Sequence, residues 1–254
     1  MGSTWSFSDE DDDGRQKKRG AEDGDRGSPK ARRLLDNVEN RRDERRRQRL
    51  ASQAAFVAQC AQNMTIAVDC SFESFMTERE LTSLGQQLMY CYGANKRASA
   101  PATFWIVGLE EGGKLHSHLR NLAGFDRWLG ADVDFRSLDA IVPALENVVY
   151  LTADADDELA EIDSDAVYVL GGIVDRNRHK GITATKAETL GIRTARLPIG
   201  PGRPLQLPGP ASHVLTVNHV FDILLNVQAS ASWATAAGCL PQRKTKRDDE
   251  PPRR

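Results

Sequence analysis

The sequence has few cysteines and no long hydrophobic segment. Its four cysteines, Cys60, Cys70, Cys91 and Cys239, are widely spaced and form no CxxC pair. This spacing favours reduced thiols over a zinc site or a disulfide framework, so we expect no bound metal. No apolar run approaches the roughly 18 residues that span a bilayer, and the acidic N-terminus is unlike a secretory signal or a transit peptide. We therefore expect a protein of the nucleus and cytoplasm without membrane partners.

Several catalytic motifs are also absent. No G-x-G-x-x-G follows a predicted strand and no G-x-x-x-x-G-K-[ST] occurs, which argues against an ordinary Rossmann site and a P-loop NTPase. No G-x-S-x-G supports an α/β-hydrolase. His116 and His118 have no evident third metal ligand, so we interpret them as surface histidines; His219 falls in a predicted helix.

The formal net charge of -2 conceals a strong asymmetry along the chain. Residues 15–49 hold 14 Lys and Arg against 7 Asp and Glu, whereas residues 51–240 hold 14 against 21. Residues 37–59 lack Gly and Pro and carry opposite charges at helical spacing, which predicts an exposed helix. Six arginines lie within nine residues of it: Arg41, Arg42, Arg45, Arg46, Arg47 and Arg49. Such density favours contact with phosphates over a merely solvated face.

Composition predicts four regions. Residues 1–36 are highly charged and poor in large apolar residues, so we expect them to be disordered. Their two basic clusters, residues 17–19 and 30–33, resemble a bipartite nuclear localisation signal; an electrostatic tail with no address is the alternative. Residues 37–62 are predicted to form a basic helical extension, 63–240 a folded domain, and 241–254 a charged tail.

The folded domain reads as an α/β protein. Short apolar runs predict strands at residues 66–68, 104–109, 148–151, 167–170 and 192–197. Helices are expected after the capping box of Thr77 and Glu80, at residues 185–190 before Gly191, and from Leu215 onward. Strands that are apolar on both faces and alternate with helices predict a parallel sheet covered on both sides.

Ligands bind beyond the carboxyl ends of the strands in such sheets, which selects the loops after Leu151, Leu170 and Leu197. The second loop is the most informative. Gly171 and Gly172 directly follow a buried strand, and Asp175 begins a run of charged and polar side chains that reaches Lys180. Stability does not require such a concentration, so we interpret the loop as functional, with a solvated basic turn as the alternative.

Six segments occur in order and at characteristic spacing: residues 68–72 (VDCSF), 150–154 (YLTAD), 171–181 (GGIVDRNRHKG), 196–200 (RLPIG), 214–221 (VLTVNHVF) and 240–244 (LPQRK). Together they resemble the tRNA (guanine-9) N1-methyltransferase family of the SPOUT class, from about residue 63 to residue 244. The resemblance implies a monomer that binds tRNA and S-adenosylmethionine, with a trefoil knot in the C-terminal part of the sheet. General topology rules alone would not predict a knot.

The resemblance also implies roles for individual residues. Asp175 matches the family's proposed general base. The S-adenosylmethionine pocket would be lined by Leu151, Gly171, Asp175, Arg176, Asn177, Arg178, His179, Thr183, Leu197, His213, Val214 and Leu215. Besides the six arginines of residues 41–49, we expect phosphate contacts from Lys96, Arg97, Arg176, Arg178, Lys180 and Arg243.

The predicted reaction is methylation of N1 of guanine 9, which first requires removal of the N1 proton. Asp175 would accept that proton, or would only orient the base or balance charge near the cofactor. Methylation of adenine 9, or of both purines, is the alternative within the class, because adenine N1 carries no proton at neutral pH. A catalytically inactive tRNA-binding module of the same fold is the alternative outside it.

Overall fold

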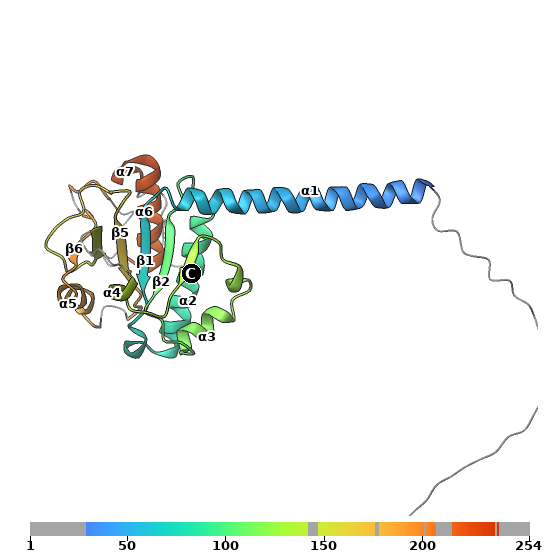
Figure 1. Ribbon diagram of the computed structural model, residues 1–254. Helices are drawn as coiled ribbons and strands as arrows, with labels where there is room; N and C mark the ends of the chain where they lie inside the picture. Colours follow the sequence, from blue (N-terminus) through green and yellow to red (C-terminus); the bar gives the residue numbers. More distant parts are fainter. Residues whose placement is uncertain are drawn as a thin grey trace, which may run out of the picture. The chain divides into compact units, whose positions relative to one another are not determined.

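The structure is a computed structural model, and it describes residues 29–141, 147–175, 178–200, 202–206, 215–236 and 238. The chain divides into two units, residues 1–49 and 50–254. Helix α1 (Pro29–Cys60) contributes to both (Figure 1). The predicted helix over residues 37–59 is therefore confirmed. It begins earlier than expected, within the stretch that we expected to be disordered up to residue 36, and Pro29 suits a first helical turn because that turn needs no N–H donor.

In the first unit, every side chain from Arg32 to Arg49 is exposed. Its large apolar side chains there, Leu34, Leu35 and Val38, are themselves exposed, and its sequence offers oppositely charged side chains at helical spacing. The six arginines of residues 41–49 are thus all accessible to solvent. The basic cluster at residues 17–19 lies outside the described residues.

The second unit is built on a sheet of six parallel strands in the order β3-β2-β1-β5-β4-β6 (Figure 1). The strands are β1 (Thr65–Asp69), β2 (Thr103–Val107), β3 (Ala131–Val133), β4 (Val148–Leu151), β5 (Val167–Gly171) and β6 (Arg193–Ala195). The central strands are buried on both faces, as parallel strands between helical layers are. The predicted parallel α/β architecture is confirmed.

Helices cover the two faces of this sheet. One face packs against α2 (Glu78–Asn95), α3 (Lys114–Arg120), α6 (Val217–Ser230) and α7 (Trp233–Ala236). The opposite face packs against α4 (Leu138–Ile141) and α5 (Ile182–Thr189). Short 3₁₀ turns are found at Glu73–Phe75 and Phe125–Arg127.

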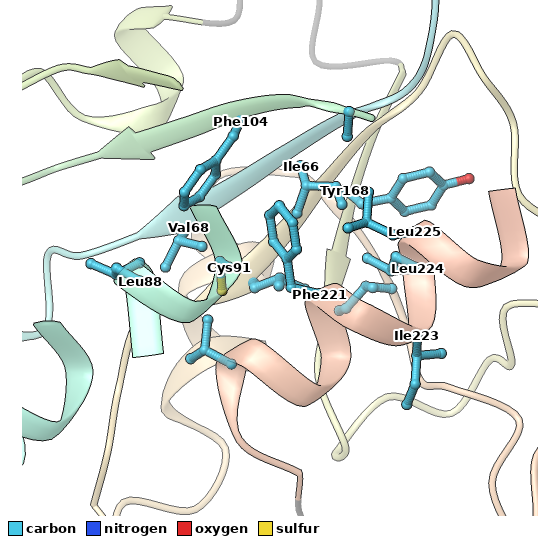
Figure 2. Close-up of a cluster of buried hydrophobic side chains, with 14 of the residues drawn as sticks. Ile66, Val68, Leu88, Cys91, Phe104, Tyr168, Phe221, Ile223, Leu224 and Leu225 are labelled. Carbon is cyan, nitrogen blue, oxygen red and sulfur yellow. The ribbon is translucent and has the colours of Figure 1, made fainter. Parts of the chain in front are cut away.

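The larger core lies between the sheet and α2 and α6. Figure 2 shows Phe221 of α6 pointing toward Phe104 of β2. The centroids of the two rings are 4.9 Å apart. Leu88 of α2 and Ile66 of β1 are fully buried in the same cluster. Edge-to-face aromatic contacts of this kind add about 0.5–1.5 kcal/mol to the stabilisation from burial. This core fixes the position of the strand ends.

Local signals in the sequence set most element ends. The capping box predicted at Thr77 is present, because the Thr77 backbone N–H donates to the Glu80 carboxylate at 2.8 Å. Helix α5 stops before Gly191, which has a positive φ of 65°. The predicted strands at residues 104–109 and 192–197 are longer than the observed β2 and β6. Strand β3 and helices α3 and α4 were not predicted, since each is short and only partly apolar.

The expected trefoil knot remains a prediction, because the segment between Gln206 and Leu215 that leads into α6 lies outside the described residues. The charged tail of residues 241–254 lies outside them too. Among the helices that the structure describes, none is long and apolar enough to cross a membrane.

Candidate functional site

A cavity of about 280 Å³ opens at the carboxyl ends of β4, β5 and β6. Its walls come from the three loops selected by the sequence, together with the start of α5 and the start of α6. The lining residues are Leu151, Thr152, Ala153, Asp154, Leu170, Gly171, Ile173, Asp175, His179, Ile182, Thr183, Arg196, Leu197, Ile199, Leu215, Val217 and Val220. This is the position at which parallel α/β sheets bind their ligands.

The two glycines at the end of β5 allow close packing around the cavity. A Cβ on Gly171 would lie 2.5 Å from Cγ2 of Thr183, and one on Gly172 would lie 2.7 Å from the backbone oxygen of Asp69. The Gly172 N–H donates to that same oxygen at 2.8 Å. The pair is therefore required by close approach of neighbouring chain segments and not by positive φ.

Asp175 is the buried carboxylate of the cavity, with 8 % of its surface exposed. Its Oδ2 accepts a hydrogen bond of 2.7 Å from the backbone N–H of His179. This bond closes the loop on itself and fixes the orientation of the carboxylate. A carboxylate held in this way inside an apolar-walled cavity is placed to accept a proton from a bound ligand.

The other polar groups of the cavity are also held by short bonds. Thr183 Oγ1 donates to Thr152 Oγ1 at 2.9 Å, which joins the start of α5 to the end of β4. Asp154 accepts from the N–H of Gly181 at 3.0 Å. Arg196 donates to the Ala155 carbonyl at 2.9 Å. These hydrogen bonds fix the positions of Thr152, Asp154 and Arg196 at the cavity.

The cavity combines apolar walls with a small number of oriented polar groups. Aliphatic side chains from β4, β5, α6 and the loop after β6 form the walls, and the lining also includes the hydroxyls of Thr152 and Thr183 and the carboxylates of Asp154 and Asp175. Sites of this kind bind small organic molecules, since the apolar walls cover most of the ligand and the few polar groups fix its orientation. An adenosyl group matches this description, since its base is flat and its ribose carries hydroxyls.

The structure brings together most of the residues that the sequence assigned to the cofactor. Seven of the twelve line the cavity: Leu151, Gly171, Asp175, His179, Thr183, Leu197 and Leu215. Arg176, Asn177, His213 and Val214 lie outside the described residues. Arg178 is described and does not line the cavity, because its guanidinium binds Glu80 at 2.7 Å. Its cofactor contact stays a prediction, which this position does not support.

The residues predicted to contact phosphates are mostly exposed. Lys96, Arg97, Arg178 and Lys180 are solvent-accessible in the second unit. The six arginines of residues 41–49 are exposed in the first unit. Arg176 and Arg243 lie outside the described residues.

Sequence reasoning missed part of the cavity wall. Thr152 and Asp154 lie in the selected loop after Leu151, but neither was assigned to the cofactor. Val217 and Val220 face the cavity from the start of α6, one turn apart. The sequence predicted only a helix from Leu215 onward, and no local signal separates a helix face that packs on a core from one that lines a cavity.

A second polar cluster lies beside the cavity, around the fully buried Asp69 at the end of β1. Lys186 donates to the Asp69 carboxylate at 2.5 Å, and Tyr150 donates to it at 2.9 Å. Burial raises the pKa of the Tyr150 phenol well above its usual range. Ser71 Oγ also donates to Asp69, at 2.8 Å. The charge of Asp69 is thus compensated, and the cluster joins β1, β4 and α5.

The two histidines interpreted as surface residues are half-buried. His118 contacts the Glu78 carboxylate at 2.9 Å, and His116 Nδ1 accepts from the Gly112 N–H at 3.0 Å. In the part of the chain that the structure describes, no three His, Cys, Asp or Glu side chains gather where they could hold a metal ion.

A family model described as tRNA (guanine(9)-N(1))-methyltransferase TRM10/TRM10A matches residues 5–245. The chain belongs to this family. It is 34% identical over 184 residues to tRNA methyltransferase 10 homolog A of Rattus norvegicus, a match that covers 72% of this chain and 53% of that protein. It is also 34% identical to a tRNA (guanine(9)-N1)-methyltransferase of Cryptococcus neoformans, covering 72% of this chain and 60% of the other.

The fold agrees with that of solved members of the TRM10 family. The crystal structure of full-length spTrm10 in complex with SAH is 32% identical and superposes with a TM-score of 0.61. That match covers 69% of this chain and 93% of the other. The resemblance to the tRNA (guanine-9) N1-methyltransferases is therefore confirmed, together with the SPOUT-type sheet. The chain spans about half the length of the curated relatives it matches.

Proposed function

We propose that this chain is an S-adenosylmethionine-dependent tRNA methyltransferase that acts on N1 of guanine at position 9. The observation that carries the proposal is Asp175, which is buried and oriented in a cavity at the ends of β4 and β5. Family membership supports the substrate, since a relative is named for this reaction. The SAH complex of spTrm10 supports the cofactor, because SAH is what S-adenosylmethionine becomes after giving up its methyl group.

The cavity suits the cofactor by its chemistry. The aliphatic side chains of Leu151, Leu197 and Leu215 would pack against the adenine, and the hydroxyl and carboxylate groups near α5 would bind the ribose and the amino acid portion. When bound there, S-adenosylmethionine supplies an activated methyl group and needs no metal.

The protein's own part in the reaction is to remove a proton and to exclude water. Guanine N1 is protonated at neutral pH and is a poor nucleophile until that proton leaves. Asp175 would accept the proton, and general-base assistance of this kind contributes about 10²–10⁴-fold. The surrounding apolar walls limit water and hold the reacting groups in one orientation.

The tRNA itself must be held by its backbone, because base 9 lies in the structured body of the molecule and must turn out to enter a cavity. The six exposed arginines of residues 41–49 supply the dense positive charge that phosphate binding needs. We further propose that the chain acts as a monomer in the nucleus and cytoplasm, which light scattering and imaging of the tagged protein test.

The decisive experiment uses two tRNA transcripts that differ only in carrying guanine or adenine at position 9. Each is incubated with the protein and S-adenosylmethionine, and the nucleosides are analysed by mass spectrometry. The proposal predicts N1-methylguanosine from the transcript with guanine at position 9 and no methylation of the transcript with adenine there. N1-methyladenosine from the second would assign adenine or dual specificity. No methylation of either, with tRNA still bound, would identify an inactive binding module.

A further inference from the structure

The loop that carries Asp175 is fastened to the start of α2 by a set of contacts outside the cavity. Arg178 Nε donates to the backbone oxygen of Asp175 at 3.0 Å, and its Nη2 donates to Glu80 Oε2 at 2.7 Å. Nη2 also lies 3.4 Å from the carbonyl oxygen of Phe75. The Arg178 guanidinium thus connects the backbone carbonyl of Asp175 to Glu80 in α2.

Further contacts follow the same path. The His179 ring meets the Phe75 ring edge-on, with centroids 5.3 Å apart. The Val174 N–H donates to the Met76 sulfur at 3.3 Å. Val174 and His179 both lie in the loop that carries Asp175, and their partners Phe75 and Met76 both precede α2. The contact of Arg178 is therefore one of several that attach Val174, Arg178 and His179 to residues 75–80.

The carboxylate of Glu80 is also held by hydrogen bonds that do not involve Arg178. Its Oε2 accepts from the backbone N–H of Thr77 at 2.8 Å and from the Thr77 hydroxyl at 2.9 Å. The hydrogen bond from the Thr77 backbone lowers the pKa of Glu80, which favours the ionised carboxylate. A fixed anion and a planar, two-point donor define one position for the loop, which a flexible pair of surface charges does not.

We propose that Glu80 and Arg178 are positioning residues, which hold the backbone at Asp175 so that its carboxylate faces the cavity in one orientation. This inference rests on the function proposed above. It assigns to Arg178 a task other than direct contact with tRNA phosphates or cofactor. It also gives the capping residue of α2 a part in catalysis.

The test compares Glu80→Gln and Arg178→Met with Glu78→Gln in the full chain. Glu78 lies in the same first turn of α2 and is also ion-paired, but with Lys114 at 3.3 Å and with His118. Glu78→Gln therefore removes an equal charge from the same helix end without touching the attachment. The readouts are the single-turnover methylation rate at saturating tRNA and cofactor, and the Kd for each.

The proposal predicts that Glu80→Gln and Arg178→Met each lower the rate by about 10- to 100-fold, the scale expected for a misplaced catalytic group. Glu78→Gln should stay within about twofold of the unaltered chain. The Kd for tRNA should not rise in Glu80→Gln, because an anion is lost. In the pH profile the midpoint should stay and the plateau should fall, since the accepting carboxylate is unchanged. A full rate in Glu80→Gln overturns the proposal.

Arg178→Lys separates positioning from charge. Lysine keeps the positive charge, but its single nitrogen cannot reproduce the planar fork in which Nε binds the Asp175 carbonyl and Nη2 binds Glu80. The rate should therefore stay low, whereas recovery of the full rate would show that only charge is needed. Hydrogen exchange tests the attachment independently of methylation activity. The backbone amide of His179, which donates to Asp175, should exchange faster in Glu80→Gln than in Glu78→Gln. Equal exchange rates in the two variants would contradict the positioning role, even if the chain methylates nothing. An unaltered chain without methylation activity would contradict only the proposed function.

Discussion

Gly171→Ala tests the packing at the mouth of the cavity. The added methyl carbon would lie 2.5 Å from Cγ2 of Thr183, whereas carbon atoms in contact are normally about 3.5–4.0 Å apart. Relief therefore requires a shift of about 1 Å at the start of α5, or rotation of Thr183 with loss of its 2.9 Å bond to Thr152. Overpacking of this kind costs about 1–3 kcal/mol, and we expect the free energy of unfolding to fall by that amount.

A second substitution isolates the cause. Thr183→Ser removes Cγ2 and keeps the hydroxyl, so in the Gly171→Ala background it should restore most of the lost stability. Urea unfolding of the single and double variants measures this coupling. Gly85→Ala in α2 is the control, because its methyl would lie 3.7 Å from the nearest atom and alanine favours the helix. Unchanged stability in Gly171→Ala, or no coupling to Thr183→Ser, would refute the packing argument.

Three further predictions concern other parts of the chain. Lys186→Met leaves the buried carboxylate of Asp69 without its cation and should lower the free energy of unfolding by about 3–5 kcal/mol. Adding Asp69→Asn should restore part of this loss. Urea unfolding of the single and double variants measures the two effects. Burial raises the pKa of Asp222 to about 6. The stability that its protonated form contributes below pH 4 is therefore lost as the pH rises through 6. Asp222→Asn should raise the free energy of unfolding at pH 7.5 by about 1 kcal/mol after screening, and should leave it unchanged at pH 4. Deleting residues 1–50 should weaken tRNA binding and flatten its salt dependence while the Kd for S-adenosylhomocysteine stays unchanged; an unaltered salt slope in a filter-binding assay would contradict the role of the arginine helix.

The architecture was predictable because its signals are local. Short apolar runs rich in β-branched residues, such as residues 148–151, favour buried strands, and the capping box at Thr77 marks a helix start without tertiary information. The short β3 was not predictable, since two of its three residues are exposed and its pairing with β2 depends on the rest of the sheet. Register and edge strands follow from packing that no local window contains.

The candidate site was predictable in part. The rule that ligands bind at strand ends selected three loops, and the cavity lies at those loops. The individual residue assignments came from the family resemblance, which no spacing rule supplied. Arg178 shows the limit of both: a cation next to Asp175 was expected to bind a ligand, whereas its partner is Glu80, 98 positions earlier in the chain. Only the three-dimensional arrangement reveals such a partner.

A crystal structure of the chain with S-adenosylhomocysteine tests the central claim most directly. The account predicts that the ligand occupies the cavity at the ends of β4, β5 and β6, with its adenine against the aliphatic walls and Asp175 facing the sulfur end. A ligand bound elsewhere, or a cavity filled by the protein's own side chains in the crystal, would contradict it.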